Sequence, residues 1–395
     1  MKTDKKLPIL FFLILLMGIP VFAIDYGFEL SNKGGIRIRD DADFFSEHRA
    51  TAWMTIPFDI NNRNSLALEG SVYTTKKEEG GYTFYLDLDF LRFSFNPVNT
   101  DRLTFHIDAG RLPVRDATGI LLNQSVDGAD FRMSMPFGNM ALFAGYTGLL
   151  NARKTGALMT ADDYADYVSD KIYALGAQRI IGKFTLHIPE LAGSTDLIIE
   201  ILGQYDMRDI IQSDYSELVN TIYGTISLTG AITNSLYYTL TGGVQGGILD
   251  TKTEQYSEIA ALGLANLMFF PVINNQFFLE FLYTTAPNKV LTTLLPITFQ
   301  NAGTIYSMGY ENLMKATLGW IFTPFSFLNF DVDAKLFMYP GKQDNVESLY
   351  IGTEVNAGVT WEVFSDLRVR FEAGIFLPNE EKIQTLLSLK AIFAL

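Results

Sequence analysis

The chain has 395 residues, among them 31 Phe, 19 Tyr and 32 Gly, and it carries a formal net charge of −14 at pH 7. The sequence contains no Cys, which excludes thiolate catalysis, cysteine-based metal sites and a disulfide framework. The acidic balance argues against nucleic acid as a partner.

The first predicted element is a secretory signal peptide over residues 1–23. Three lysines stand among the first six residues, an apolar run follows from Leu7 to Phe22, and the small residue Ala23 ends the segment where a signal peptidase would cleave. The run is too short and too interrupted by proline to serve as a membrane-spanning helix. We therefore expect an exported chain whose residues 24–395 form a single domain, because no linker or change in composition divides them.

Beyond the signal, apolar and polar residues alternate along most of the chain. From Leu367 to Ile375 every second residue is apolar, and Arg368, Arg370 and Glu372 stand between them. The segment 328–336 alternates in the same way. Because successive side chains of a strand point to opposite faces, this period of two predicts strands with one apolar and one wet face.

The alternation divides the chain into about eighteen strands, in chain order 26–38, 47–60, 65–75, 82–95, 102–111, 127–135, 139–149, 171–187, 195–206, 217–231, 236–248, 257–271, 276–286, 305–322, 327–338, 349–363, 367–376 and 385–395. Short turns alternate with longer, more polar connections, and aromatic residues gather at the strand ends. This is the anatomy of a bacterial outer-membrane barrel. The predicted fold is all-β: a transmembrane, antiparallel up-and-down β-barrel of about 18 strands, with about 16 as the alternative count.

The charged residues decide which face points inward. An Arg or Lys side chain at the lipid-facing midplane costs about 2–4 kcal/mol, and acidic residues cost somewhat less. The charged faces of the two segments described above would together cost on the order of 10 kcal/mol if they faced lipid. We therefore expect them to line an aqueous interior, which is too wide in such a barrel for side chains to fill.

The whole chain resembles the bacterial porin class, through its signal peptide, its alternation and a strand that runs to the last residue. The segment Ala109-Gly-Arg-Leu-Pro-Val-Arg-Asp-Ala-Thr-Gly119, followed by Val126-Asp-Gly-Ala-Asp130, looks like the porins in which one strand ends in Gly-Arg and the next begins with Asp-Gly. This resemblance implies an intervening loop that folds toward the channel; a solvated loop with ordinary turn residues is the alternative. The segment Thr385–Leu395 resembles the terminal assembly signal but ends in Leu rather than Phe.

The resemblance implies a protein of the outer membrane of a double-membraned bacterium. Its expected partners are membrane lipid, small solutes and, during biogenesis, the barrel-assembly machinery and periplasmic chaperones; a homo-oligomer is one of the states that it allows. The residues expected to line the pore or its constriction are Arg111, Arg115, Asp116, Asp130, Arg132, Asp331, Asp333, Lys335, Arg368, Arg370 and Glu372.

The predicted function is passive diffusion of small hydrophilic solutes or ions. No catalytic, cofactor-binding or metal site is predicted, because the three His residues lie on separate segments and the carboxylates show no recognisable spacing. Two alternatives are retained. A transporter of hydrophobic compounds, similar to the fatty-acid transporters, would suit the apolar loop stretches Ile120–Leu122 and Leu291–Ile297. A surface adhesin barrel would suit long loops rich in Tyr and Asp.

Overall fold

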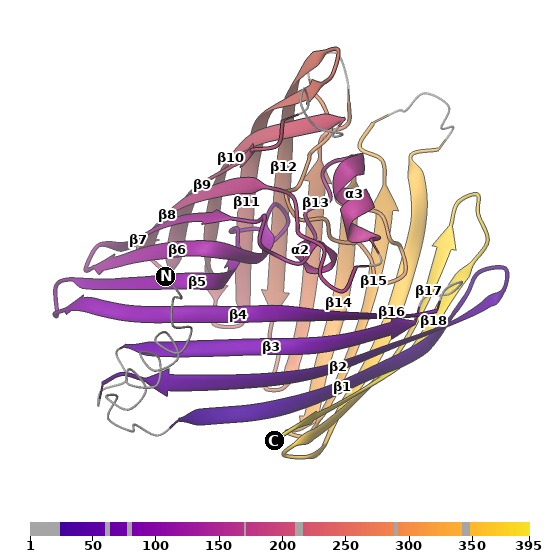
Figure 1. Ribbon diagram of the computed structural model, residues 1–395. Helices are drawn as coiled ribbons and strands as arrows, with labels where there is room; N and C mark the ends of the chain where they lie inside the picture. The colour runs from indigo at the N-terminus through magenta and orange to yellow at the C-terminus, as the bar shows by residue number, and fades with distance from the viewer. Residues whose placement is uncertain are drawn as a thin grey trace, which may run out of the picture.

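The computed structural model describes residues 24–59, 64–76, 81–169, 171–209, 216–287, 291–341 and 348–395. The predicted signal peptide, residues 1–23, lies outside the described residues. In the part of the chain that the structure describes, eighteen strands form one sheet (Figure 1). Their bounds are β1 Asp25–Ile38, β2 Ala42–Pro57, β3 Ser65–Lys76, β4 Tyr82–Asn99, β5 Thr104–Arg115, β6 Asn123–Met135, β7 Gly138–Tyr146, β8 Arg179–Ala192, β9 Thr195–Asp206, β10 Glu217–Thr233, β11 Leu236–Thr251, β12 Gln255–Phe269, β13 Asn275–Thr284, β14 Met314–Phe325, β15 Leu328–Met338, β16 Tyr350–Phe364, β17 Leu367–Pro378 and β18 Gln384–Ala394.

Each strand pairs with its neighbours along the chain, and the first strand also pairs with the last. The register of this closing antiparallel pair runs from Glu29 opposite Ala394 to Ile38 opposite Thr385. Closure places every described strand between two neighbours, so most of their backbone hydrogen bonds are made within the sheet. The predicted all-β, up-and-down barrel and the predicted count of eighteen strands are confirmed.

Adjacent side chains along a strand separate an outer from an inner face. Ile201 of β9 is 49% exposed and the next residue, Leu202, is 1% exposed. Ile222 and Tyr223 of β10 differ in the same way, with 57% and 1% exposed. The exposed apolar residues form the outer face, and the buried ones point into the barrel, where loop residues cover them. Among the described residues, no helix is long and apolar enough to cross a membrane.

Three long connections lie at one end of the barrel and fold inward. They join β5 to β6 (residues 116–122), β7 to β8 (147–178, with residue 170 not described) and β13 to β14 (285–313, with 288–290 not described). The β7–β8 connection contains the helices α2 (Ala152–Thr155) and α3 (Ala161–Tyr167), which Figure 1 shows within the outline of the barrel. These connections, and not the strands alone, shape the inner space.

Two predicted strands begin too early. The predicted segments 171–187 and 305–322 correspond to β8 and β14, which begin at Arg179 and Met314. The residues before them belong to the inward-folded connections, where Ile305 is only 1% exposed. Apolar residues that are buried against the inside of the wall therefore extend the strand-like pattern in the sequence beyond the strands themselves.

Candidate functional site

The hairpin formed by β5 and β6 separates from β4 near the end of the barrel that carries the long connections. β4 and β5 stay paired only as far as Leu91 and Arg111, whereas β5 and β6 stay paired as far as Arg115 and Asn123. Gly110, next to the point of separation, has φ of 132°, and a Cβ atom there would lie 2.2 Å from the carbonyl oxygen of Leu91. The backbone at this point therefore requires glycine.

Arg111 fixes the separated strands. Its Nε and Nη2 atoms donate to the two carboxylate oxygens of Asp127 on β6, at 2.8 and 2.9 Å. Its Nη1 atom donates to the carbonyl oxygen of Leu88 on β4, at 2.8 Å. A second β4 carbonyl, that of Leu86, accepts a hydrogen bond from Nδ2 of Asn151 at 3.0 Å. Side chains thus take the place of the missing β4–β5 ladder.

Asp116 shapes the tip of the hairpin, which we define as residues 112–125. Its buried carboxylate accepts backbone N–H groups from Thr118 at 2.8 Å, Leu121 at 3.1 Å and Leu122 at 2.9 Å. Three donors on one carboxylate make a compact turn, because charge-assisted hydrogen bonds are stronger than neutral ones. The turn directs the apolar residues of the tip against the opposite inner wall.

An apolar cluster holds the hairpin tip inside the barrel. Leu121 and Leu122 of the tip and Leu294 and Ile297 of the β13–β14 connection are all 0% exposed. They pack with inward-facing side chains from β7 to β13, namely Phe143, Ile181, Leu202, Tyr223, Ala260, Leu262 and Leu282. The two apolar loop stretches noted in the sequence are therefore buried against each other and against the wall. They do not line an open apolar path.

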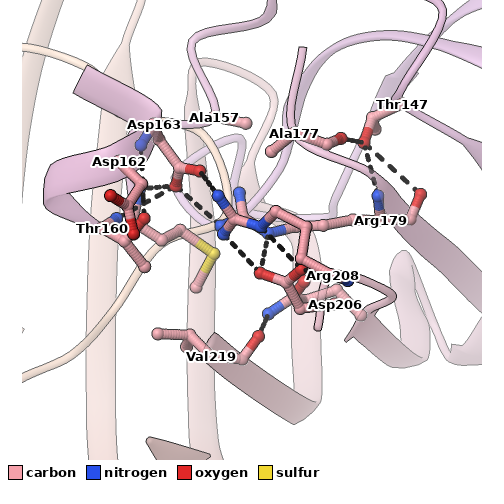
Figure 2. Close-up of polar contacts among 12 residues, drawn as sticks. Thr147, Ala157, Thr160, Asp162, Asp163, Ala177, Arg179, Asp206, Arg208 and Val219 are labelled. Atoms are coloured by element: carbon pink, nitrogen blue, oxygen red, sulfur yellow. Dashed lines mark hydrogen bonds and ion pairs between the residues drawn. The ribbon is translucent and has the colours of Figure 1, made fainter. Parts of the chain in front are cut away.

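A cluster of four buried charges fixes α3 (Figure 2). Nη2 of Arg179 on β8 lies 2.6 Å from Oδ2 of Asp163 on α3. Nη1 of Arg208 lies 3.0 Å from Oδ1 of the same carboxylate. Both guanidinium groups also contact Asp206 at the end of β9, at 3.3 Å from Arg179 and 2.9 Å from Arg208. All four side chains are at most 1% exposed, so each depends on the others for a partner.

The three inward connections are bonded to one another. The backbone N–H of Ile297 donates to the carbonyl oxygen of Leu121 at 2.8 Å, and that of Phe299 donates to Gly156 at 2.6 Å. Nε2 of Gln300 donates to the carbonyl oxygen of Gly119 at 2.7 Å. The β13–β14 connection therefore joins the hairpin tip to the β7–β8 connection, and the three act as one inner structure.

A cavity of about 410 Å³ lies between the hairpin tip and the wall that β4 to β8 form. The hairpin tip and β7 contribute apolar side chains to its lining. Its charged side chains are four cations and two carboxylates: Arg92, Arg115, Arg132, Lys183, Asp108 and Asp130. This cavity is the candidate functional site, because it combines charged groups with space for a small molecule next to the inward-folded structure.

Two of the cations in the cavity are neutralised. Arg132 pairs with Asp108 and, through Nε at 2.8 Å, with Asp130. Nζ of Lys183 lies 3.5 Å from the carboxylate of Glu200.

The other two cations lack such a partner. The guanidinium of Arg92 lies 5.2 Å from the centre of the Phe90 ring. Among the described residues, no carboxylate pairs with Arg92 or with Arg115. The cavity consequently has an excess of positive charge, although the chain as a whole is acidic.

The wall formed by β15 to β17 carries a second group of inward-facing charges. Nη1 and Nη2 of Arg370 contact the two carboxylate oxygens of Asp331, at 2.7 and 2.9 Å. Nη2 of Arg370 also lies 3.3 Å from Glu372. Nζ of Lys335 lies 2.9 Å from Asp333. These charges are mutually paired, unlike Arg92 and Arg115 at the cavity.

The residues that the sequence predicted as pore-lining fall into three places. Arg115, Asp130 and Arg132 meet at the cavity. Arg111 and Asp116 are buried in the contacts that shape the hairpin. The remaining ones lie on β15 and β17, and they are Asp331, Asp333, Lys335, Arg368, Arg370 and Glu372. That solutes pass along these residues stays a prediction.

Sequence reasoning did not single out α3 or its buried charges. One signal was present: Thr160 and Asp163 form a capping box, in which each side chain accepts the backbone N–H of the other residue. This spacing of a hydroxyl and an acidic residue typically starts a helix. The partners Arg179 and Arg208 lie on distant segments, and no local pattern would have joined them to α3.

No protein-family model matches the sequence, and comparison with curated proteins finds no match. Solved structures of bacterial proteins do match. Acinetobacter baumannii OccAB4 has a TM-score of 0.58 at 12% identity, covering 95% of this chain and 98% of that chain. The outer membrane protein OprD from Pseudomonas aeruginosa has a TM-score of 0.54 at 13% identity, covering 94% and 93%. Pseudomonas aeruginosa OpdK with vanillate has a TM-score of 0.56 at 9% identity, covering 94% and 98%. The predicted porin-like barrel is confirmed at the level of the fold.

Proposed function

We propose that this protein is an outer-membrane channel through which small hydrophilic solutes and ions cross by passive diffusion. The observation that supports this most directly is the separation of the two faces of a closed barrel. Apolar side chains such as Ile201 and Ile222 face outward, and charged side chains such as Arg132 and Asp331 face inward. A closed sheet with this polarity is stable in a bilayer because lipid meets mainly apolar groups.

The inward-folded connections form the constriction of this channel. A barrel of eighteen strands encloses more space than its own side chains can fill. The hairpin tip, the β7–β8 connection and the β13–β14 connection occupy part of that space and bring Arg115 next to the inner wall. Solutes pass beside this structure, where the cavity of about 410 Å³ lies.

The unpaired cations of the cavity favour anionic solutes. Arg92 and Arg115 have no carboxylate partner among the described residues, whereas the carboxylates of Asp108 and Asp130 are engaged with Arg132. Local charge at a constriction, more than the net charge of the chain, sets the selectivity of a pore. One protein of similar fold was solved with vanillate, a small carboxylate. We assign small anions as the preferred solutes of this chain.

The two alternatives have less support. An apolar passage would need exposed apolar loop residues, yet Leu121 and Leu294 are fully buried. An adhesin would present its long loops to the outside, yet the β7–β8 and β13–β14 connections fold into the barrel. The barrel-assembly machinery, periplasmic chaperones and a homo-oligomer stay predicted partners and states.

The test is single-channel recording of the refolded protein in a planar bilayer under a salt gradient. We expect ohmic steps and a reversal potential whose sign indicates a preference for anions over cations. Steps with cation preference would contradict the assignment of solute charge. Silence from protein that is verified as a folded barrel would contradict the channel itself.

A further inference from the structure

A segment of the β13–β14 connection spans the interior of the barrel. We call residues 297–306 the strap. At its first end, the backbone N–H groups of Ile297 and Phe299 donate to Leu121 of the hairpin tip and to Gly156. At its second end, it contacts β16. β17, β18 and β1 to β4 lie between β16 and β5 by the shorter way round the sheet. The strap therefore joins distant parts of the wall.

The second end of the strap wraps around a single carboxylate, that of Glu354 on β16. Oε1 accepts the backbone N–H of Thr304 at 2.8 Å, and Oε2 accepts those of Ile305 at 2.9 Å and Tyr306 at 2.8 Å. Glu354 is 0% exposed. Three successive backbone N–H groups that converge in this way form a concave anion site. Here the anion is a side chain of the wall itself.

Two further features show how closely the strap fits Glu354. A Cβ atom on Gly303 would lie 2.5 Å from Oε2 of the carboxylate, so only glycine leaves enough room. Nζ of Lys335 lies 3.1 Å from Oε1 and neutralises its charge. Beside the carboxylate, the ring of Tyr306 lies 4.6 Å from that of Phe337, measured between centroids. The attachment is polar at its centre and apolar at its side.

We infer that Glu354 is the positioning residue of the constriction: its carboxylate fixes the strap, the strap is bonded to the hairpin tip, and the hairpin tip lines the cavity and sets its width. This inference rests on the proposed channel function. Glu354 acts through the strap and does not touch the solute. The competing role is that of an ordinary charge in the lumen, which would alter ion selectivity without altering the width of the opening.

The first test is Glu354→Gln, which keeps the size of the side chain. The amide offers one acceptor oxygen where the carboxylate offers two, and its NH₂ group would face backbone donors. We expect the amides of Thr304, Ile305 and Tyr306 to exchange roughly tenfold faster or more. In bilayers we expect larger single-channel steps with frequent fluctuations between levels.

Glu280→Gln is the matched control. Glu280 lies on β13, pairs with Lys315 at 3.0 Å, and loses the same charge in the variant, but it has no contact with the strap among those that the structure shows. We expect wild-type exchange at the three strap amides and a wild-type step size. If Glu354→Gln behaves like Glu280→Gln in both measurements, Glu354 is only a lumen charge and the inference is wrong.

A second variant perturbs the same attachment from the side of the connection. Gly303→Ala inserts a methyl group against the carboxylate and leaves every strand unchanged. It replaces Glu354→Gln if that variant does not fold. We expect the same faster exchange at Thr304 to Tyr306. Unchanged exchange in a folded Gly303→Ala barrel would overturn the inference.

A crosslink between the strap and the wall tests whether Glu354 acts by holding the strap in position or through its own charge. The chain has no Cys, so two introduced thiols are the only ones present. Oγ1 of Thr304 and Nζ of Lys335 lie 3.3 Å apart, so Thr304→Cys with Lys335→Cys places thiols on the strap and on the wall. In the Glu354→Gln background, bridging them with a short bifunctional thiol reagent should restore the wild-type step size. If the bridged protein keeps fluctuating, the strap does not set the width.

The two proposals can fail separately. If the folded wild-type protein does not conduct, the channel function is wrong, and amide exchange still decides whether Glu354 holds the strap. If it conducts and the exchange of Thr304, Ile305 and Tyr306 is the same in all variants, only the inference about Glu354 is wrong.

Discussion

Asp331 on β15 and Arg370 on β17 form a two-point ion pair across the strand that lies between them. The oxygen–nitrogen distances are 2.7 and 2.9 Å. The residue under the pair is Gly358 of β16, which lies opposite Asp331 in the ladder. A Cβ atom on Gly358 would lie 2.5 Å from both Oδ2 of Asp331 and Nη2 of Arg370. The pair exists because the middle strand has no side chain at this position.

Gly358→Ala should therefore destabilise the barrel. The added methyl group would push apart the ends of two side chains that are 34% and 25% exposed, and the loss of an ion pair of this kind costs about 1 kcal/mol or less. The measurement is the midpoint of urea unfolding in lipid vesicles. Gly182→Ala is the control, because a Cβ atom there meets nothing within 4 Å. The prediction is wrong if the two variants unfold at the same midpoint.

Neutralising the unpaired cations of the cavity should weaken anion preference. Arg92→Gln with Arg115→Gln removes two positive charges that no described carboxylate balances. We expect the reversal potential under a salt gradient to move toward that of a cation-preferring pore. Lys252→Gln, in the turn between β11 and β12, removes one positive charge outside the cavity. This control variant should keep the reversal potential of the wild type. If the wild type and both variants had the same reversal potential, the cavity would not lie on the conduction path.

Asp163→Asn should release the β7–β8 connection without unfolding the barrel. The change leaves the buried Arg179 and Arg208 with the single carboxylate of Asp206, and breaking a buried charge network costs about 3–5 kcal/mol. We expect proteolytic cleavage between residues 150 and 169 to become faster, with the urea midpoint of the strands unchanged. Asp163→Leu with Arg208→Met removes charges of both signs and should be less damaging. A connection that stays protected in Asp163→Asn would show that packing alone holds α3.

The contact between α3 and the start of β10 should weaken in acid. Desolvation raises the pKa of the Asp162 carboxyl, but hydrogen bonds from the backbone N–H and hydroxyl of Ser216, at 2.8 and 3.0 Å, outweigh it and hold the pKa below its ordinary value. A carboxyl whose pKa is lower in the folded state stabilises the fold above its unfolded pKa of about 4. This contribution is lost as the pH falls through the folded value. The protection of the Ser216 amide against exchange should fall accordingly, and Asp162→Asn should remove the dependence on pH.

Much of the barrel could be predicted because strand formation leaves a local signal. β9 was predicted over residues 195–206 and is found over Thr195–Asp206. The starts of β8 and β14 were predicted wrongly, because residues such as Ile305 are buried by contacts with distant strands. A period of two indicates that successive residues face two different environments. It does not record whether the apolar environment is lipid or an inward-folded connection.

The candidate site was less accessible to sequence reasoning. Alternation indicates that Asp331 and Arg370 face the same side, but their pairing depends on Gly358 in a third strand. Arg111 was predicted from a motif, and the structure places its guanidinium against Asp127 and two carbonyl groups. Its part in conduction stays a prediction. Partners of this kind are set by the register of the sheet, which no single segment reveals.

The separation of β4 from β5 bears on how this channel can be engineered. Beyond Leu91, toward the end of the barrel that carries the long connections, β4 is no longer paired with β5. There the side chains of Asn151 and Arg111 donate hydrogen bonds to β4 carbonyl groups instead. Asn151 belongs to the β7–β8 connection. Deleting that connection to obtain a wider pore would therefore also leave the Leu86 carbonyl without its Asn151 donor. The shortened protein would gain space inside the barrel and lose part of the support of its own wall.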